Sequence, residues 1–298
     1  MPVTSPRGSP ERDRSPPRPL RIGSRQKWLT VHGRRKWAHY YDPQSIERQR
    51  QFFDHFLKQT GTSVPAWPRV SLEVRERANV GEMRAESEWP LARTQYRKLF
   101  LDALDGTLHR TPRLALGMSE YEPVAGGRVR FDHRFDADTE LTGHMSLRLW
   151  VEAVDADDMD LFVALQKLDA DGKEVPFIFY AMLETGPVAL GWLRVSHREL
   201  DGKRSRIGRP VHTHVREARL QAGQIAEVDI EIWPSSTHFA AGEQLRLVIQ
   251  GDDVIKAGAP NAPLARHEET RNRGRHRIHT GGPHDSHLLI PLIPSLGI

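Results

Sequence analysis

The stretch GWLRVSHREL, from Gly191 to Leu200, indicates the fold class of this chain. Leu193 and Val195 alternate with polar residues, which is the period of a strand with one buried face. The polar run Ser196-His197-Arg198 then closes the strand. At a buried strand end these side chains can satisfy backbone groups and pair with Asp160, so we interpret them as structural.

The same alternation recurs on both sides of this stretch. It marks residues 70–74, 147–151, 161–165, 225–233 and 245–249. Turn residues separate the runs at 125–127, 169–172, 201–202 and 241–242. Many short strands with little helical periodicity predict a mainly β fold, a jelly-roll-like sandwich over residues 68–298.

The first part of the chain has a different pattern. Residues 1–26 are rich in proline and arginine and hold almost nothing apolar, so we expect a disordered tail. Residues 28–32 form an apolar run that predicts a short strand. Asp42 and Pro43 then suit the N-cap and first position of a helix. Residues 27–67 are therefore predicted to be the end of an α/β unit.

Composition excludes several classes of protein and site. The chain has no cysteine, which excludes disulfides, thiolate metal sites and cysteine nucleophiles. No apolar run approaches the roughly 18 residues of a membrane span, and no apolar core marks a signal peptide. A net charge of +4 comes from basic residues mixed with 39 acids. We expect a cytoplasmic protein with a mixed, solvated surface that binds neither nucleic acid nor membrane.

Histidines and acids gather in the C-terminal part without a fixed metal motif. His212 and His214 stand at alternate positions and could share one strand face. We interpret the remaining histidines as surface and turn residues; they are His267, His276, His279, His284 and His287. We interpret four acids as an acidic strand edge: Asp155, Asp157, Asp158 and Asp160. We interpret four arginines as a basic hairpin that lacks a stacking platform: Arg271, Arg273, Arg275 and Arg277. The sequence predicts neither a metal nor a cofactor.

Five phrases resemble a known family in their order along the chain. They are Trp89-Pro90, Asp138 to Gly143, Asp157 to Phe162, Gly191 to Arg198 and Leu245 to Leu247. They are similar to the C-terminal β-sandwich, galactose-binding-like in fold, of the X-Pro dipeptidyl-peptidase and cocaine esterase type of serine hydrolase. In that family the sandwich packs against the hydrolase domain and helps to wall the substrate pocket, while the residues that do chemistry lie elsewhere.

A second resemblance covers the α/β unit. Lys27 to Gly33, Lys36-Trp37, Tyr40-Tyr41 and Phe52 to Lys58 are similar to the end of the hydrolase domain in the same family. There the segment that carries the catalytic histidine precedes a helix of this kind. The resemblance implies that His32 is the histidine of a Ser-His-Asp triad, although the usual Gly-Pro-Trp-Ser-His form is absent here.

The nucleophile and the acid of such a triad have no counterpart in this sequence. No G-x-S-x-G motif occurs, and the nearest approach, Gly117 to Tyr121, lacks the second glycine. We therefore expect a truncated member of the family. It would be inactive alone and would act on an ester or peptide substrate only when a hydrolase domain completes it.

The alternative is a non-catalytic β-sandwich module that binds carbohydrate or a partner protein. Exposed aromatic residues on one sheet face would favour binding, whereas an apolar face within residues 27–57 would favour a missing hydrolase domain. In the second case we expect Trp28, Leu29, Val31, Phe53, Phe56 and Leu57 to lack cover. We then expect self-association through that face.

Overall fold

The computed structural model describes residues 23–179, 183–255, 267 and 269–294, and its fold is mainly β. The central strands are β4 (Gln95–Asp102), β5 (Thr107–His109), β7 (Arg128–Arg134), β8 (Thr139–Ala153), β9 (Asp160–Leu168), β13 (Ala189–Arg194), β14 (Ile225–Phe239), β15 (Gln244–Gln250) and β17 (His287–Ile293). Further strands are β2 (Val70–Arg77), β3 (Val80–Glu86), β6 (Gly117–Tyr121), β10 (Glu174–Val175), β11 (Phe177–Phe179), β12 (Leu183–Gly186) and β16 (His276–Thr280).

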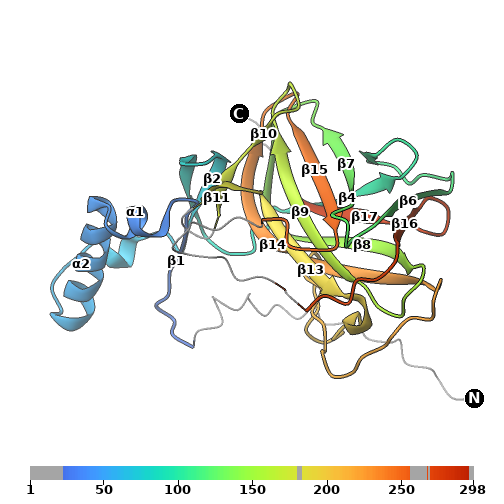
Figure 1. The fold of residues 1–298 in the computed structure, drawn as a ribbon. Helices are drawn as coiled ribbons and strands as arrows, with labels where there is room; N and C mark the ends of the chain where they lie inside the picture. Colours follow the sequence, from blue (N-terminus) through green and yellow to red (C-terminus); the bar gives the residue numbers. More distant parts are fainter. Residues whose placement is uncertain (1–22, 180–182, 256–266, 268, 295–298) are drawn as a thin grey trace, which may run out of the picture.

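The central strands form a closed path. Their order is β14-β13-β9-β15-β7-β5-β4-β17-β8, and β8 pairs back onto β14. This antiparallel pairing runs from Ile225 opposite Glu152 to Phe239 opposite Thr139. The result is the sandwich, barrel-like in its closure, seen on the right of Figure 1. The predicted sandwich is confirmed, while the finer jelly-roll-like and galactose-binding-like description stays a prediction.

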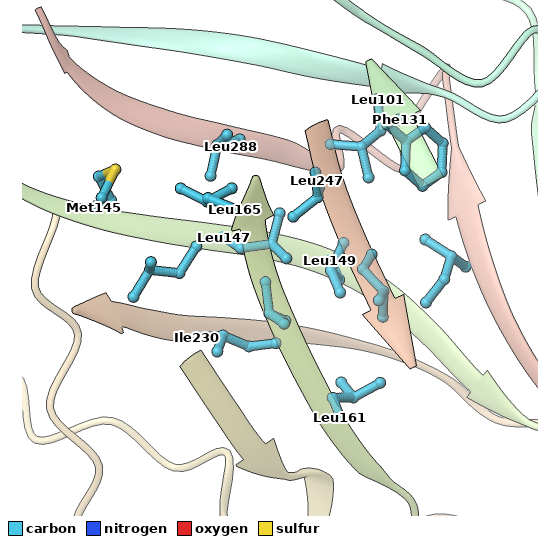
Figure 2. Close-up of a cluster of buried hydrophobic side chains, with 14 of the residues drawn as sticks. Leu101, Phe131, Met145, Leu147, Leu149, Leu161, Leu165, Ile230, Leu247 and Leu288 are labelled. Carbon is cyan, nitrogen blue, oxygen red and sulfur yellow. The ribbon is translucent and has the colours of Figure 1, made fainter. Parts of the chain in front are cut away.

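The core fills the space between the two layers of strands. Leu147, Leu149, Leu161, Leu165 and Ile230 are fully buried and point into it (Figure 2). Each such side chain contributes roughly 1.5–3 kcal/mol of burial free energy. These residues lie in runs whose alternation predicted strands.

Proline and glycine interrupt the ladders on both sides of β8. The register of β14 shifts between Ile232 and Ser235, around Pro234, and that of β17 shifts between Leu289 and Leu292, around Pro291. Proline has no amide hydrogen to give to a ladder. Between them Gly143 of β8 has φ 146°, and a Cβ there would lie 2.9 Å from the Cβ of Pro291. Only glycine suits this position.

An N-terminal unit lies beside the sandwich. It consists of β1 (Leu29–Val31), α1 (Lys36–Tyr40), α2 (Pro43–Leu57) and the 3-10 turn η2 (Val64–Ala66). The carboxylate of Asp42 accepts a 2.9 Å hydrogen bond from the amide of Gln44, and Pro43 opens α2, as predicted. Both helices project away from the sandwich, on the left of Figure 1.

This unit is joined to the sandwich by strand pairing. β1 runs parallel to β2, from Leu29 opposite Val70 to Val31 opposite Leu72, and β2 in turn pairs with β14. The expectation that the unit lacks cover is therefore right only in part. Val31, Phe53 and Leu57 are exposed. Leu29, however, packs on Val70 and its neighbours, because β1 docks edge to edge on β2.

Two aromatic residues of the unit also have cover that we did not expect. Trp28 contacts Phe56 and Trp67, with ring centroids 6.3 and 6.1 Å apart. Of the predicted tail, residues 1–22 lie outside the described residues. No helix in the described part of the chain is long and apolar enough to cross a membrane.

The buried histidine of β16 makes stability depend on pH. His276 is fully buried, its Nδ1 lies 3.2 Å from the Tyr121 hydroxyl, and burial lowers its pKa to about 4. In the unfolded chain His276 binds a proton near pH 6.5. The contribution of neutral His276 to the free energy of unfolding is therefore fully present above that pH and is lost as pH falls toward 4. From this residue we expect a loss of about 2 kcal/mol between pH 7 and pH 5.

Urea unfolding of the wild type and of His276→Gln at both pH values measures this contribution. The variant should lose about 2 kcal/mol less than the wild type over the same interval. His238→Gln, a change at a partly exposed histidine of β14, is the control. Equal losses in the wild type and His276→Gln would contradict the prediction.

Candidate active site

His32 lies at the carboxyl end of β1. The strand leaves β2 after Val31, so His32 opens the loop Gly33–Arg35 that leads to α1. Its side chain is half-buried. The parallel pairing brings this loop over Glu73 and Arg75, two residues of β2 that share one face.

The imidazole of His32 is held by two neighbours. Its ring stacks on that of His39 from α1, with centroids 3.6 Å apart and planes at 23°. The amide of Arg34 donates a 3.2 Å hydrogen bond to Nδ1. Burial lowers the pKa of His32, His39 and Arg34 lower it further, and Glu73 opposes them. The ring is therefore neutral at pH 7 and carries its proton on Nε2.

This tautomer is the reverse of the one that a triad base uses. A triad histidine donates from Nδ1 to an acid and keeps the lone pair of Nε2 for the serine proton. Within the described ranges, no carboxylate accepts from the His32 ring and no hydroxyl donates to it. Base chemistry at His32 therefore requires an acid to replace the Arg34 amide at Nδ1.

Two clefts meet at His32. An apolar cleft of about 560 Å³ lies between β1, the β11–β12 hairpin and strands β13 and β14, and Val31, Leu190 and Trp233 contribute to its wall. A polar cleft of about 840 Å³ lies between β2–β3 and the two helices. The histidine thus has apolar space on one side and polar space on the other.

The nearest approach to a nucleophile motif is not a nucleophile turn. Ser119 lies in β6, where it pairs with Ile278 of β16. β1 and β6 stand at opposite ends of the strand order, and they lie on opposite sides of the molecule in Figure 1. A serine in a regular strand lacks the sharp turn that exposes a nucleophile.

The run Ser196-His197-Arg198 makes only part of the contacts that we expected, since Ser196 Oγ and His197 Nδ1 are buried without a hydrogen-bond partner among the described residues. It forms a 3-10 turn, η3 (Val195–His197), rather than the end of a strand. The amide of Ser196 donates to Asp158 at 2.9 Å, and Arg198 donates to the carbonyls of Val195 and Ala218. Asp160 pairs instead with Arg194, because the chain turns before Arg198 can reach it.

His212 and His214 do not share a strand face, because neither lies in a named strand, but their ring centroids are 5.8 Å apart. His214 has φ 51°, so the backbone turns there, and His212 bonds the carbonyl of Asp229 at 2.9 Å. The interpretation of the later histidines as surface and turn residues is wrong for His276 and His287, which are buried in β16 and β17. Each of the five has a partner: Asp253 for His267, Tyr121 for His276, Glu152 for His279, the ring of Trp150 for His284 and the carbonyl of Asp285 for His287.

The four acids do not form a strand edge: Asp155, Asp157 and Asp158 lie in the loop between β8 and β9, and Asp160 opens β9, which is paired on both sides. Each carboxylate lies beside an arginine: Asp155 by Arg275, Asp157 by Arg219, Asp158 by Arg271 and Asp160 by Arg194. Three of the four predicted hairpin arginines also bind acids, with Arg271 on Glu217 and both Arg275 and Arg277 on Glu120. These cations are used to join strands and loops.

One cluster of possible metal ligands was not predicted. Asp102, Asp105 and His109 surround the turn between β4 and β5, the one such group of three among the described residues. The turn depends on Gly106, at φ 71°, and its hairpin geometry could not be inferred from spacing. Arg113 donates to the buried Asp102 carboxylate at 2.6 Å. That arginine supplies the charge that a metal would otherwise provide.

The fold and the position of His32 define a β-sandwich attached to the last strand and helix of an α/β unit. The model of the X-Pro dipeptidyl-peptidase C-terminal non-catalytic domain matches residues 63–289. The chain belongs to this family, and to the wider group of cocaine esterase-like hydrolases that carry the domain.

Relatives support this assignment. The cocaine esterase of Rhodococcus sp. (strain MB1 Bresler) is 25% identical, over 86% of this chain and 47% of that protein. A CocE/NonD family hydrolase from Staphylococcus aureus is 42% identical, with a TM-score of 0.88 over 91% of this chain and 50% of that one. An α-amino acid ester hydrolase, at 14% identity and TM-score 0.64 over 89% of this chain and 50% of its own, shares the fold. This chain spans about half the length of these proteins.

The environment of His32 predicts that the isolated chain has no esterase activity. The purified chain should hydrolyse p-nitrophenyl acetate, or a Gly-Pro-anilide, no faster than its His32→Ala variant, because no hydroxyl contacts the ring in the described part of the chain. The measurement is release of p-nitrophenol from the ester or of the aniline from the anilide. Stoichiometric labelling of one serine by a fluorophosphonate would contradict the prediction.

Proposed function

We propose that this chain is the C-terminal part of a CocE/NonD-type serine hydrolase with dipeptidyl-peptidase or acyl esterase activity. His32 is its general base. The observation that carries the proposal is the position of this histidine at the carboxyl end of a parallel strand, where two clefts meet. Catalytic groups of α/β hydrolases stand at the carboxyl ends of such strands.

In this proposal His32 is the one triad residue that this chain supplies. The serine and the acid come from the half of the relatives that this chain does not match. In the complete site the ring adopts the other tautomer: Nδ1 carries the hydrogen and donates a hydrogen bond to the acid, which stays ionised and replaces the Arg34 amide, and the bare Nε2 receives the serine proton. The same nitrogen then returns the proton to the leaving group, which is the alcohol of an ester or the amine of a peptide.

The exposed apolar face of the N-terminal unit supports the proposal. Val31, Trp37, Tyr41, Phe53 and Leu57 are between 48% and 75% exposed. Parallel strands are normally buried on both faces, so the unit resembles the edge of a larger α/β domain. We propose residues 27–67 as the end of that domain and residues 68–298 as a jelly-roll-like sandwich. The lack of cysteine supports a cytoplasmic location.

Complementation between two fragments tests this function. The chain is co-expressed with the unmatched half of the S. aureus hydrolase, and hydrolysis of p-nitrophenyl acetate is measured for the purified complex and for each half. We expect activity only in the complex. His32→Ala should lower that activity by about 100-fold or more, the usual contribution of a general base. His238→Ala is the matched control, and an active His32→Ala complex would refute the role of His32.

The same face predicts self-association of the chain alone. Each large apolar side chain left in water forgoes roughly 1.5–3 kcal/mol of burial, which drives association. Deletion of residues 1–60 should reduce self-association, seen as a smaller rise of the sedimentation coefficient with protein concentration, and keep the β-rich circular dichroism. If the deletion unfolds the sandwich instead, the N-terminal unit belongs to its core and the proposed division is wrong.

A second candidate function is carbohydrate binding, favoured by one specific observation. Trp192 of β13 and Trp233 of β14 stand on the outer sheet face, 41% and 47% exposed, with ring centroids 5.2 Å apart. They line a groove of about 790 Å³ together with Arg194, His214 and Glu269. Indole faces suit the apolar side of a sugar ring, and polar side chains suit its hydroxyls.

Affinity electrophoresis in gels that contain a neutral polysaccharide tests the second candidate. Binding should weaken by about tenfold in Trp192→Ala, because a stacked indole is among the strongest contacts of such a site. Trp37→Ala, on α1, is the matched control. Equal mobility of the wild-type chain with and without a panel of polysaccharides would reject this function.

A further inference from the structure

Glu73 is a buried carboxylate directly beneath the His32 loop. It follows Leu72 in β2, where the ladder with β1 ends. Its Oε2 accepts a 2.8 Å hydrogen bond from the amide of Gly33, and its Oε1 lies 2.5 Å from Nη2 of Arg34. The side chain is only 2% exposed. Beyond the end of the ladder, this carboxylate therefore holds Gly33 and Arg34, the two residues that follow His32.

Arg34 is held from the other side as well. Its guanidinium donates to the carbonyl of Asn79, in the turn between β2 and β3, and to the carbonyl of Gly81, near the start of β3. Asn79 has φ 61°, so this turn is tight and its carbonyls are fixed in direction. Arg34 therefore bridges Glu73 and the turn. We call Glu73 and Arg34 together the loop clamp.

Arg75 supports the same loop two residues further along β2. A Cβ at Gly33 would lie 2.2 Å from Cδ of Arg75, so the arginine stem crosses directly under Gly33. Its guanidinium donates to Ser235 Oγ at 2.6 Å and to the carbonyl of Val188 at 3.1 Å. The floor of the loop is thus tied to the sandwich, and only glycine leaves room for the contact.

We propose that Glu73 is a positioning residue for His32. It anchors the amide of Gly33, where the loop leaves β1, and it places a negative charge near the ring. This inference rests on the proposed function, in which His32 becomes an imidazolium ion during each proton transfer. A buried carboxylate that is already fully paired costs no further reorganisation when that charge appears.

The charges around His32 make the role of Glu73 measurable. Glu73 raises the pKa of His32, against burial and the effects of His39 and Arg34. The other charged groups that line the two clefts at His32 are Asp42, Glu47, Arg48 and Arg75. Of the two carboxylates among them, Asp42 caps α2 and Glu47 pairs with Arg50. Removal of the Glu73 charge should therefore change the pKa of the His32 ring directly.

NMR titration of the His32 ring in the purified chain is the first test. Glu73→Gln removes the charge and keeps an acceptor for Gly33, so the pKa of His32 should fall by about 0.5–1 unit. Glu73→Ala removes the acceptor too, and exchange of the Gly33 amide hydrogen should become about tenfold faster or more. Glu86→Gln is the matched control, because Glu86 is a buried carboxylate of β3 paired with Arg84 and Arg93. An unchanged His32 pKa in Glu73→Gln would overturn the proposal.

The fragment complex supplies a second readout. Glu73→Gln should move the acidic limb of the pH profile of kcat to lower pH and reduce kcat about tenfold, with little change in KM. A profile identical to that of the wild type would overturn the proposal even if the NMR shift occurs. If no fragment pair is active while the ring shifts as expected, the proposed function fails and the positioning of His32 by Glu73 stands.

Discussion

The antiparallel pairing of β8 and β14 is the constraint on which the rest of the structure depends. Both strands span fifteen residues, and their ladder closes the sheet on itself. β8 also carries β16 and β17, while β14 carries β13 and, through Thr237, the strand β2. The N-terminal unit is joined to the sheet through this contact between β14 and β2. The position of His32 thus depends on the pairing of β8 with β14, two strands that lie more than a hundred positions further along the chain.

Local periodicity found seven of the seventeen strands in the described residues, but not their partners. The seven are β1, β2, β8, β9, β13, β14 and β15. Leu147 to Val151 alternate clearly, and the Asp42-Pro43 pair marks the start of α2 as its capping chemistry requires. The closure of the sheet depends on register between distant strands, which no local pattern encodes. For the same reason the cover of Leu29 was missed, since it comes from β2. The turn at Ser196 was missed because its backbone bonds to Asp158, a residue of another loop.

The candidate site was predictable only as far as one residue. His32 could be found through its resemblance to a hydrolase segment, because a lone histidine after a strand carries no signal of its own. Its surroundings could not be found, since Glu73 lies forty residues away and resembles any charged residue of an alternating strand. The pattern Val70, Leu72, Val74 placed Glu73 on the polar face of β2. Only the parallel strand beside it turns that face inward.

The ladder between β1 and β2 has a consequence for how such proteins can be rearranged during evolution. A domain that is joined only by a linker can be exchanged as a cassette, cut at the linker and replaced. Here the boundary drawn through residues 67 and 68 is crossed by hydrogen bonds from Leu29 to Arg69 and by the side chains of Glu73 and Arg75. A sandwich from another protein, joined at that boundary, would bring an edge of β2 that does not match β1. An exchange at that boundary would therefore have to keep the edge of β2 on which the histidine loop rests.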